Sequence, residues 1–244
     1  MQRLGSKKRL APKLWETIVK HVPITDETYF VDLFCGGCGM ASYVPLKNKI
    51  ANDKSKPLIA YLRKIVKDTS WLPKENNITK EEYEHMRENQ HLYPLYQLGY
   101  VGNNYSFNGQ YFQGFANYKN NANIALRAYK SAVKDAEALK NVKIYNRDYK
   151  NVPIPPKSIV YCDIPYKGTA KYNDIDEEFD YDEFYRYVKK LRKQGHYVFI
   201  SEYTTEVPNG IVEIGQYKRK SNMRNSGKSR TGRKFAEYKR RKKK

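Results

Sequence analysis

Short apolar runs that predict β-strands alternate with stretches of helical spacing along most of this chain. The clearest runs are residues 29–34, 49–52 and 159–163, and each contains or leads to an aspartate. Parallel strands need a crossover connection, usually a helix, so this alternation favours parallel strands with helices on both faces of the sheet. The sequence therefore predicts an α/β fold with a doubly wound, mostly parallel sheet.

One region interrupts this alternation. Further strands are predicted at residues 142–145, 197–201, 211–214 and 234–238, and helices at residues 9–21, 56–67, 122–139 and 180–193, with another beginning at Met40. Residues 67–121 are instead rich in Asn, Gln, Tyr and Gly and lack a long buried strand. There, Thr79 and Glu82 have capping-box spacing, and residues 100–115 suit a hairpin or an ordered loop. We predict an inserted domain at residues 67–121, between core segments at residues 1–66 and 122–244.

Positive charge is in large excess over the 244 residues of the chain. Lys and Arg number 46 against 26 Asp and Glu, which gives a formal net charge of +20. Such a charge favours a polyanionic partner, and nucleic acid fits better than an acidic membrane surface. Lys-rich usage throughout a host proteome is the alternative explanation. The 23 tyrosines suit stacking on bases, although most of them suit a core or its rim equally well.

The chain lacks the usual sequence signs of export. No run reaches the roughly 18 apolar residues that span a bilayer. The first residues are basic and polar, so we expect no signal peptide. An odd count of three cysteines fits a reducing compartment without a disulfide framework. We therefore expect a cytoplasmic protein with no membrane segment.

A glycine-rich turn follows the first predicted strand. Residues 32–39 read Asp-Leu-Phe-Cys-Gly-Gly-Cys-Gly and lead towards the helix expected from Met40. Glycines let the backbone turn tightly and approach a ligand closely. Asp53 ends the next strand about 20 residues later, where a carboxylate can accept hydrogen bonds from both ribose hydroxyls. With Asp32 available for a cationic amine, these features predict an adenosine-type cofactor without phosphates. The alternative is structural, with Asp32 as a cap and the glycines as a tight turn.

Cys35 and Cys38 also have the spacing of half a zinc site or of a redox pair. A structural zinc needs about four ligands. Cys162 is the remaining cysteine, and the four histidines show no paired spacing, so we expect no metal. A thioredoxin-like redox pair stays open as an alternative to the glycine-turn interpretation.

A second motif follows the strand predicted at residues 159–163. Val-Tyr-Cys-Asp-Ile-Pro-Tyr at residues 160–166 brings an acceptor (Asp163), a stiffened backbone (Pro165) and a flat ring (Tyr166) close together. Such a trio suits a planar, amine-bearing ligand such as a base taken out of its stack. The same residues also begin ordinary turns, so the motif gains weight only from the glycine turn that precedes it.

Together these motifs resemble the Dam-like, D12 class of adenine-specific DNA methyltransferases over almost the whole chain. Residues 30–37 are similar to the family's cofactor loop, residues 5–7 to its N-terminal cofactor motif, and residues 160–166 to its catalytic D-P-P-Y segment. The resemblance implies a Rossmann-like methyltransferase sheet, with residues 67–121 as a target-recognition domain. The residues that it assigns to the cofactor, S-adenosylmethionine, are Gly5, Lys7, Asp32, Phe34, Cys35, Gly36, Gly37, Asp53, Asp148 and Tyr149.

The catalytic assignments are Asp163, Ile164, Pro165 and Tyr166. The family usually has proline where this chain has Ile164, a position that contributes its backbone carbonyl to the target amine. Isoleucine keeps that carbonyl, and Pro165 still biases Ile164 towards an extended backbone. The resemblance implies that Asp163 and this carbonyl accept the two hydrogens of an adenine amine, while Tyr166 stacks on the flipped base.

Two segments are predicted to contact double-stranded DNA. In the insertion, Asn104, Tyr105 and Asn108 combine amides that can read base edges with a ring that can fill the gap of a flipped base. Core packing is the alternative for Tyr105. A basic stretch between the last two strands can grip phosphates through Lys220, Arg224, Lys228, Arg230 and Arg233, or be a solvated loop. We expect a monomer, with a transient dimer as the alternative.

Other readings of the sequence stay open. The same chemistry could act on a cytosine amine, on RNA or on a glutamine side chain. Ile164 and the high charge also fit a catalytically weak nucleic-acid-binding protein with a methyltransferase fold. The sequence does not define the recognition site, a restriction partner or a phage origin. It places the enzyme in the cytoplasm of a bacterium or a phage-infected cell only through the resemblance.

Overall fold

The structure is a computed structural model that describes residues 6–116, 123–166, 178–202, 210–217 and 233–238. The described residues form one seven-stranded sheet in the order β3-β2-β1-β4-β5-β7-β6. Its strands are β1 (Tyr29–Asp32), β2 (Asn48–Asn52), β3 (Val142–Tyr145), β4 (Ile159–Cys162), β5 (Tyr197–Glu202), β6 (Ile211–Tyr217) and β7 (Arg233–Tyr238). The first five are parallel, and β7 runs antiparallel to both β5 and β6. The predicted doubly wound, mostly parallel sheet is confirmed.

The direction of winding reverses between two central strands. From β1 the chain passes outward through β2 to β3, and then returns to place β4 on the other side of β1. In the β1–β4 register, Asp32 lies beside Tyr161, so Asp32 and Asp163 leave the same edge of the sheet. Loops diverge where the order reverses, and in open α/β sheets ligands bind in the crevice that this opens.

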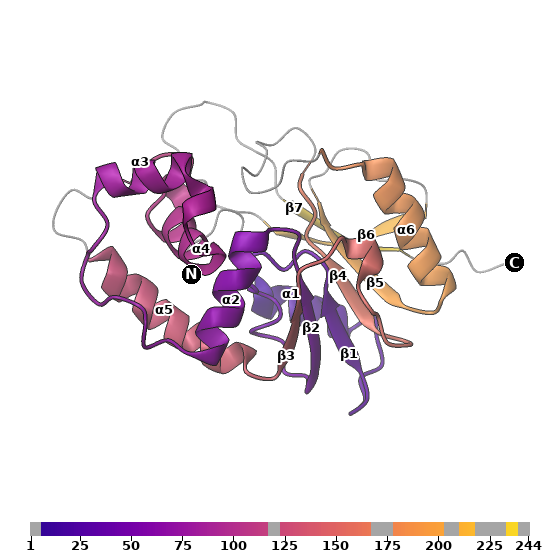
Figure 1. The fold of residues 1–244 in the computed structure, drawn as a ribbon. Coiled ribbons are helices and arrows are strands. Elements are labelled where there is room, and N and C mark those ends of the chain that lie inside the picture. Colours follow the sequence, from indigo (N-terminus) through magenta and orange to yellow (C-terminus); the bar gives the residue numbers. More distant parts are fainter. Residues whose placement is uncertain (1–5, 117–122, 167–177, 203–209, 218–232, 239–244) are drawn as a thin grey trace, which may run out of the picture.

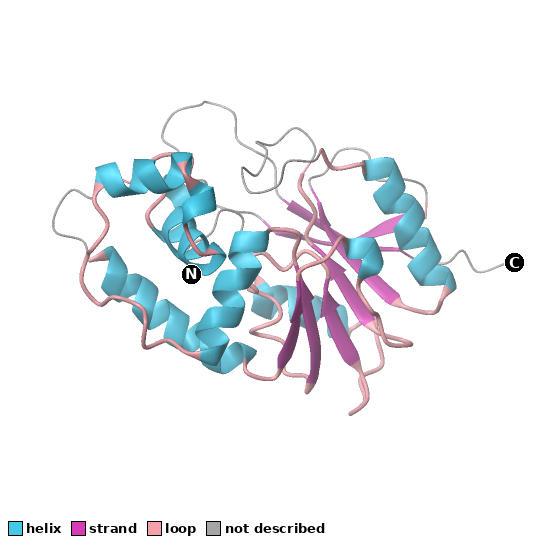
Figure 2. Ribbon diagram, viewed as in Figure 1, coloured by secondary structure: helices cyan, strands magenta, loops and turns pink. Residues whose placement is uncertain are grey.

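Helices cover both faces of the sheet (Figure 2). They are α1 (Ala11–Val19), α2 (Lys56–Lys67), α3 (Lys80–Glu88), α4 (Leu95–Asn104), α5 (Ile124–Leu139) and α6 (Tyr181–Lys193), with short 3-10 turns η1 (Gln90–Leu92), η2 (Phe107–Gly109) and η3 (Tyr149–Asn151). Phe30 and Tyr161 pack in the cluster that includes α1, whereas Val31 and Val160 pack in the cluster that includes α6. Successive side chains of a strand point to opposite faces, so each central strand is buried on both sides. No described helix has the length and apolar character to cross a membrane.

The helix predicted from Met40 does not form. Residues 34–43 make successive turns, with hydrogen bonds from Ser42 N to Cys38 O (2.9 Å) and from Val44 N to Met40 O (3.0 Å). Two features keep these turns from joining into a helix. Cys38 has a positive φ of 55°, which interrupts right-handed helical backbone. Pro45 follows Val44 directly and disfavours the helical conformation there.

The hairpin suggested for residues 100–115 is also wrong in its first half, because α4 extends to Asn104. A single antiparallel bridge, Ser106 to Phe115, joins the rest of the segment. Two glycines of α4, Gly99 and Gly102, are packing residues. A Cβ at Gly99 would lie 2.1 Å from the Pro57 carbonyl oxygen, so α4 meets α2 at a distance that only glycine allows.

The insertion shares its core with the sheet domain. In Figure 1, α3, α4 and α5 lie on one side of the sheet, with α2 between them and the strands. One apolar cluster includes Leu58 and Leu62 of α2, Tyr83 of α3, Leu98 of α4 and Ala128 of α5. Because this cluster is continuous and includes Ala51 of β2 and Val142 of β3, the described residues 67–116 are held against this half of the sheet by buried apolar surface.

Replacing Gly99 by alanine tests this close packing. Alanine would gain about 1 kcal/mol of helix propensity. Overpacking against the Pro57 carbonyl costs about 1–3 kcal/mol, and the 2.1 Å approach places Gly99 at the costly end of that range. We expect Gly99→Ala to lower the free energy of unfolding, measured by urea denaturation. Gly114→Ala is the matched control, because a Cβ there meets nothing within 4 Å. Equal stability of the two variants would contradict the packing argument.

Candidate active site

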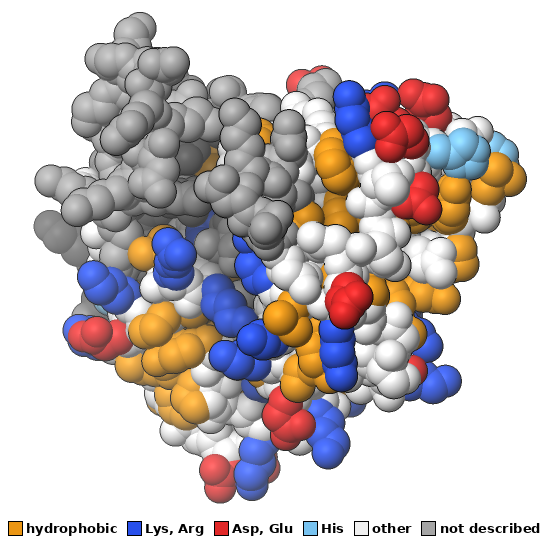
Figure 3. Space-filling view, turned by 90° about the vertical axis from the view of Figure 1, so that its left-hand side faces the viewer, with side chains coloured by type: hydrophobic (Ala, Val, Ile, Leu, Met, Phe, Trp, Pro, Cys, Tyr) orange, Lys and Arg blue, Asp and Glu red, His pale blue; other side chains and the backbone are white. Residues whose placement is uncertain are grey.

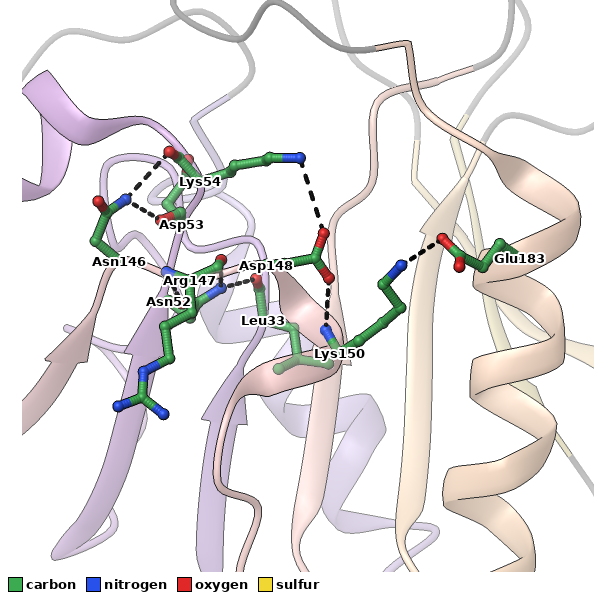
Figure 4. A network of polar contacts seen from close by, with 9 residues as sticks. All are labelled: Leu33, Asn52, Asp53, Lys54, Asn146, Arg147, Asp148, Lys150 and Glu183. Carbon is green, nitrogen blue, oxygen red and sulfur yellow. Dashed lines mark hydrogen bonds and ion pairs between the residues drawn. The ribbon is translucent and has the colours of Figure 1, made fainter.

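The amide of Asn52 joins the loops that follow three neighbouring strands (Figure 4). Asn52 ends β2 and is 1% exposed. Its Nδ2 donates to the carbonyls of Leu33 and Arg147, each at 3.1 Å, and its Oδ1 accepts from Arg147 N at 3.0 Å. Its backbone carbonyl also accepts from Cys35 N at 2.8 Å. The loops after β1, β2 and β3 therefore converge on one buried side chain.

Asp53 fixes the glycine turn. Its Oδ2 accepts from Gly36 N at 2.9 Å and its Oδ1 from Ser55 N at 3.0 Å. Gly36 has a φ of 49°, the left-handed conformation that glycine adopts without strain. Ser55 caps α2 by accepting from Leu58 N. Asp53 thus ties the turn after β1 to the start of α2.

The N-terminal segment, residues 6–10, packs directly onto the glycine turn. A Cβ at Gly39 would lie 2.7 Å from Lys8 N and 3.2 Å from Lys7 C, so this close approach requires glycine. The Lys7 carbonyl accepts from the backbone N–H groups of Leu10 and Ala11, both at 2.8 Å, at the start of α1. Lys7 itself is only 6% exposed, and its ammonium forms an ion pair with Asp163 Oδ2.

Residues 163–166 surround that ion pair. Tyr166 donates its hydroxyl hydrogen to Asp163 Oδ1 at 2.8 Å, and Lys7 Nζ lies 5.3 Å from the centre of the Tyr166 ring. Ile164 is 2% exposed, and its side chain packs in the apolar cluster that includes α6. No described residue donates to the Ile164 carbonyl. The Pro165 carbonyl, in contrast, accepts from the Tyr181 hydroxyl at 3.0 Å.

Asp32 is the most buried acid of this edge, at 1% exposure. Its Oδ1 has no hydrogen-bond partner. Burial raises the pKa of Asp32 well above its usual range, the charges of Asp163 and Asp53 raise it further, and Lys7 opposes them. Three carboxylates therefore interact at the ends of β1, β2 and β4, with the Lys7 ammonium beside them. Such a site favours a ligand that carries positive charge.

An aromatic group stands beside the acids. The rings of Phe34 and Tyr149 lie 5.3 Å apart between centroids, and Phe179 and Phe184 pack against both. Asp148 precedes Tyr149, accepts from Lys150 N at 3.0 Å and lies 3.8 Å from the Lys54 ammonium. The structure thus brings Phe34 and Asp148-Tyr149, which lie far apart in the sequence, to the same edge.

The cysteines of the turn have a structural environment. Cys35 and Cys38 are buried free thiols. Burial raises the pKa of the Cys35 thiol well above its usual range, and the neighbouring Cys38 adds to this effect. A reactive thiol needs the opposite shift, so the geometry does not favour the redox pair. Among the described residues, no group of three or more His, Cys, Asp or Glu is arranged to hold a metal ion.

The residues predicted to contact DNA fall into three groups. Asn104 and Tyr105 are buried, with Asn104 donating to Tyr100 O at 2.9 Å, so both pack inside the insertion. Asn108 is exposed at a φ of 55°, next to Phe107, which is 62% exposed. Arg233 begins β7. Lys220, Arg224, Lys228, Arg230 and the cofactor candidate Gly5 lie outside the described residues.

The sequence alone indicated no role for two residues at this edge of the sheet. Asn52 directly precedes Asp53, and only Asp53 was expected to bind a ligand. Gly39 was one of several glycines in the turn, and only the path of residues 6–10 shows why it must be glycine. A buried asparagine at the end of a strand is a weak signal in one sequence, because its side-chain partners, Leu33 and Arg147, come from distant loops.

The raised pKa of Asp32 predicts a pH-dependent stability. Protonated Asp32 favours the folded state below its usual pKa, and this contribution is lost as pH rises through the raised folded-state value. The asparagine of Asp32→Asn does not titrate. The free energy of unfolding of this variant, relative to that of the wild type, should therefore rise with pH by about 1.4 kcal/mol for each pH unit between the unfolded-state and folded-state pKa values of Asp32. Thermal unfolding of the free protein from pH 4 to about 9 measures this. Asp182→Asn, on the exposed side of α6, is the charge control. A stability difference that stays constant with pH would contradict the prediction.

Replacing Ile164 by alanine tests whether its side chain or its backbone carbonyl is needed. Removing the buried side chain should lower the free energy of unfolding by about 2–5 kcal/mol, whereas the carbonyl remains. If the Ile164 carbonyl, and not its side chain, serves the activity that the family resemblance implies, folded Ile164→Ala should keep a rate close to that of the wild type, because the truncation leaves the carbonyl in place. A large loss of rate in a variant shown to be folded by circular dichroism would assign the side chain a role in the reaction.

Comparison with known proteins identifies the family of this chain. A family model described as D12 class N6 adenine-specific DNA methyltransferase matches residues 4–225. Two solved structures of the rRNA methyltransferase aviRa from Streptomyces viridochromogenes align with 10% identity and a TM-score of 0.44, covering 95% of this chain and 84% of theirs. No curated protein matches the chain in sequence. Because the family model spans nearly the whole chain, this protein belongs to the D12 class of N6 adenine-specific DNA methyltransferases.

Proposed function

We propose that the carboxyl edge of the sheet binds S-adenosylmethionine together with an adenine flipped out of double-stranded DNA, and that Asp163 and the Ile164 carbonyl accept the hydrogens of its amine. One observation supports this most. Asp163 follows β4 at the point where β1 and β4 diverge, beside Asp32 and Lys7. A donor and an acceptor of the methyl group can both be held in the crevice at such a switch point.

The residues present suit the proposed cofactor. When bound, S-adenosylmethionine supplies a methyl group on a cationic sulfur. A buried carboxylate oxygen without a partner, such as Asp32 Oδ1, is costly unless a ligand satisfies it. We assign Asp32 to the amino group and Asp53 to the ribose hydroxyls. The remaining residues proposed to line this side are Gly5, Phe34, Cys35, Gly36, Gly37, Asp148 and Tyr149.

The acceptor side follows from the electronic structure of adenine. Its exocyclic amine is a weak nucleophile, since the lone pair is delocalised into the ring. When Asp163 and the Ile164 carbonyl accept the two N–H hydrogens, the lone pair becomes localised on nitrogen and available for attack. The ionised carboxylate also favours the positive charge that develops there. Tyr166 is placed to stack on the base, and positioning supplies much of the rate.

The DNA is proposed to lie over the face that the insertion and α5 present. Figure 3 shows Lys and Arg side chains gathered across this face. Arg127, Lys130 and Lys134 are exposed on α5, and Phe107 and Asn108 are exposed on η2. Lys and Arg at these positions can pair with phosphates. We propose that the basic stretch also contacts the DNA backbone, through Lys220, Arg224, Lys228, Arg230 and Arg233. We further propose that the enzyme acts as a monomer in the cytoplasm of a bacterial or phage-infected cell.

Labelled S-adenosylmethionine tests the substrate. The purified protein is incubated with unmethylated double-stranded DNA, matched single-stranded DNA and RNA. We expect label in N6-methyladenine of the duplex. Sequencing the modified bases of DNA from cells that express the protein then defines the recognition site. Label in cytosine or in RNA, or binding without label, would overturn the proposal in favour of the alternatives.

Asp163 is the residue whose loss should separate binding from chemistry. Asp163→Ala removes the charged acceptor, so we expect the methyl-transfer rate to fall by about 10²-fold or more. Cofactor affinity, measured by calorimetry, should stay within a few-fold of the wild type, because Asp32 and Asp53 remain. Asp182→Ala serves as a surface control on both measurements. Near wild-type transfer by Asp163→Ala would remove Asp163 from the mechanism.

A further inference from the structure

The first turn of α6 is bonded to the loop after β4 through one tyrosine hydroxyl. Tyr181, the first residue of α6, donates its hydroxyl hydrogen to the Pro165 carbonyl at 3.0 Å. A carbonyl can only accept, so this bond uses the single hydrogen that a tyrosine hydroxyl carries. Tyr181 lies outside the motifs that the sequence assigned to cofactor, target base or DNA, so its contact with the catalytic loop is a finding of the structure.

We propose that Tyr181 is a positioning residue for methyl transfer, which acts by fixing the direction of the Pro165 carbonyl. Through that carbonyl it holds the Ile164 carbonyl and the Tyr166 ring in the arrangement that the target base requires. This inference rests on the proposed function, because it takes the roles of Ile164 and Tyr166 from it. It adds α6 to the elements that shape the acceptor side of the site.

The backbone geometry of proline explains why this one carbonyl matters. The pyrrolidine ring locks φ of Pro165, and the peptide groups on either side of it are planar. The dihedral ψ of Pro165 is therefore the one soft backbone angle between the Ile164 carbonyl and the Cα atom of Tyr166. That angle decides where the Pro165 carbonyl points, and the Tyr181 hydroxyl binds this carbonyl from a fixed direction. Loss of the hydroxyl would free the Tyr166 ring to move relative to the Ile164 carbonyl.

Two other contacts hold the loop, but they act on different groups. The buried Ile164 side chain packs in the apolar cluster that includes α6. The Tyr166 hydroxyl, at the far end of its ring, donates to Asp163 Oδ1 at 2.8 Å. The Tyr181 bond acts directly on the peptide group between Pro165 and Tyr166. The three contacts together restrain side chain, ring and backbone of the same short segment.

Tyr181 is itself held in place, as a positioning residue must be. Its ring meets that of Phe179 edge-on, with 5.0 Å between the centroids, and Asp180 caps α6 at the residue before it. Burial raises the pKa of the Tyr181 hydroxyl, and the charges of Glu202 and Glu178 raise it further. The hydroxyl therefore keeps its hydrogen at neutral pH and remains a donor to the loop.

Two further tyrosines of α6 provide matched controls. Tyr187 also donates its hydroxyl hydrogen to a backbone carbonyl, that of Tyr149 at 3.3 Å, on the side of the site proposed for the cofactor. Tyr185 packs its ring against Phe184 at 5.3 Å, and its hydroxyl has no hydrogen-bond partner among the described residues. Replacing each tyrosine by phenylalanine removes the same atom from the same helix in three different surroundings.

The test compares kcat and KM for methyl transfer, with single-turnover rates to separate the chemical step from product release. For Tyr181→Phe we expect kcat to fall about tenfold, because misplaced reacting groups slow the chemical step. Its KM for S-adenosylmethionine and its Kd for DNA should stay close to those of the wild type. Tyr187→Phe should instead raise the KM for S-adenosylmethionine and keep kcat. Tyr185→Phe should match the wild type in both.

The outcomes separate this inference from the function on which it rests. If the wild type labels no amine, or if Asp163→Ala keeps its rate, the proposed function fails and the inference falls with it. Label in cytosine or RNA would overturn only the substrate, and the variants are then compared on the substrate that is labelled. If Asp163→Ala is inactive but Tyr181→Phe keeps the kcat of Tyr185→Phe, the role of Tyr181 alone is overturned. A Tyr181→Phe variant that unfolds by circular dichroism would make the hydroxyl a structural group and would overturn it too.

Discussion

One buried amide, that of Asn52, holds together the edge of the sheet on which the site depends. A parallel sheet delivers the ends of its strands to one edge, but the loops that follow are free to diverge. Asn52 uses both polar atoms of its side chain on the loops after β1 and β3. Asp53, the next residue, holds the glycine turn to α2. Each buried polar group is satisfied by backbone, so the loops are fixed without apolar packing.

That fixed edge carries an electrostatic cost. Asp32, Asp53 and Asp163 interact closely enough for two of them to raise the pKa of the third. Folding such a group is unfavourable unless cations balance it, and the buried Lys7 does so in part. The remaining imbalance favours a cationic ligand. Stability and binding therefore oppose each other at Asp32, as is common where a site is organised for a charged partner.

Local patterns predicted most of the fold. Residues 142–145 form β3 as expected, and α6 has the acids, bases and glycine stop that its sequence indicated. The errors arose where a local signal had two meanings. Gly102 stood in a segment expected to be a hairpin or an ordered loop, yet it lies in α4 and packs against Tyr111. Met40 had helical surroundings, yet Cys38 and Pro45 on either side restrict the backbone to turns. Asp32 and Asp163 were found from motifs, whereas Asn52 and Gly39 required the tertiary contacts.

The continuous core between α2 and the predicted insertion ties the neighbouring helices to the sheet. The helix α5 follows the insertion, packs in the shared apolar cluster and carries Asp135. The ion pair of Lys8 with Asp135 and that of Lys7 with Asp163 thus join α5 to the loop after β4 through two adjacent residues. An insertion with a core of its own could move on DNA without disturbing the sheet. Here, any displacement of α5 must either stretch the Lys8–Asp135 pair or carry Lys7 with it, so the position of α5 and that of the Lys7–Asp163 pair are physically connected.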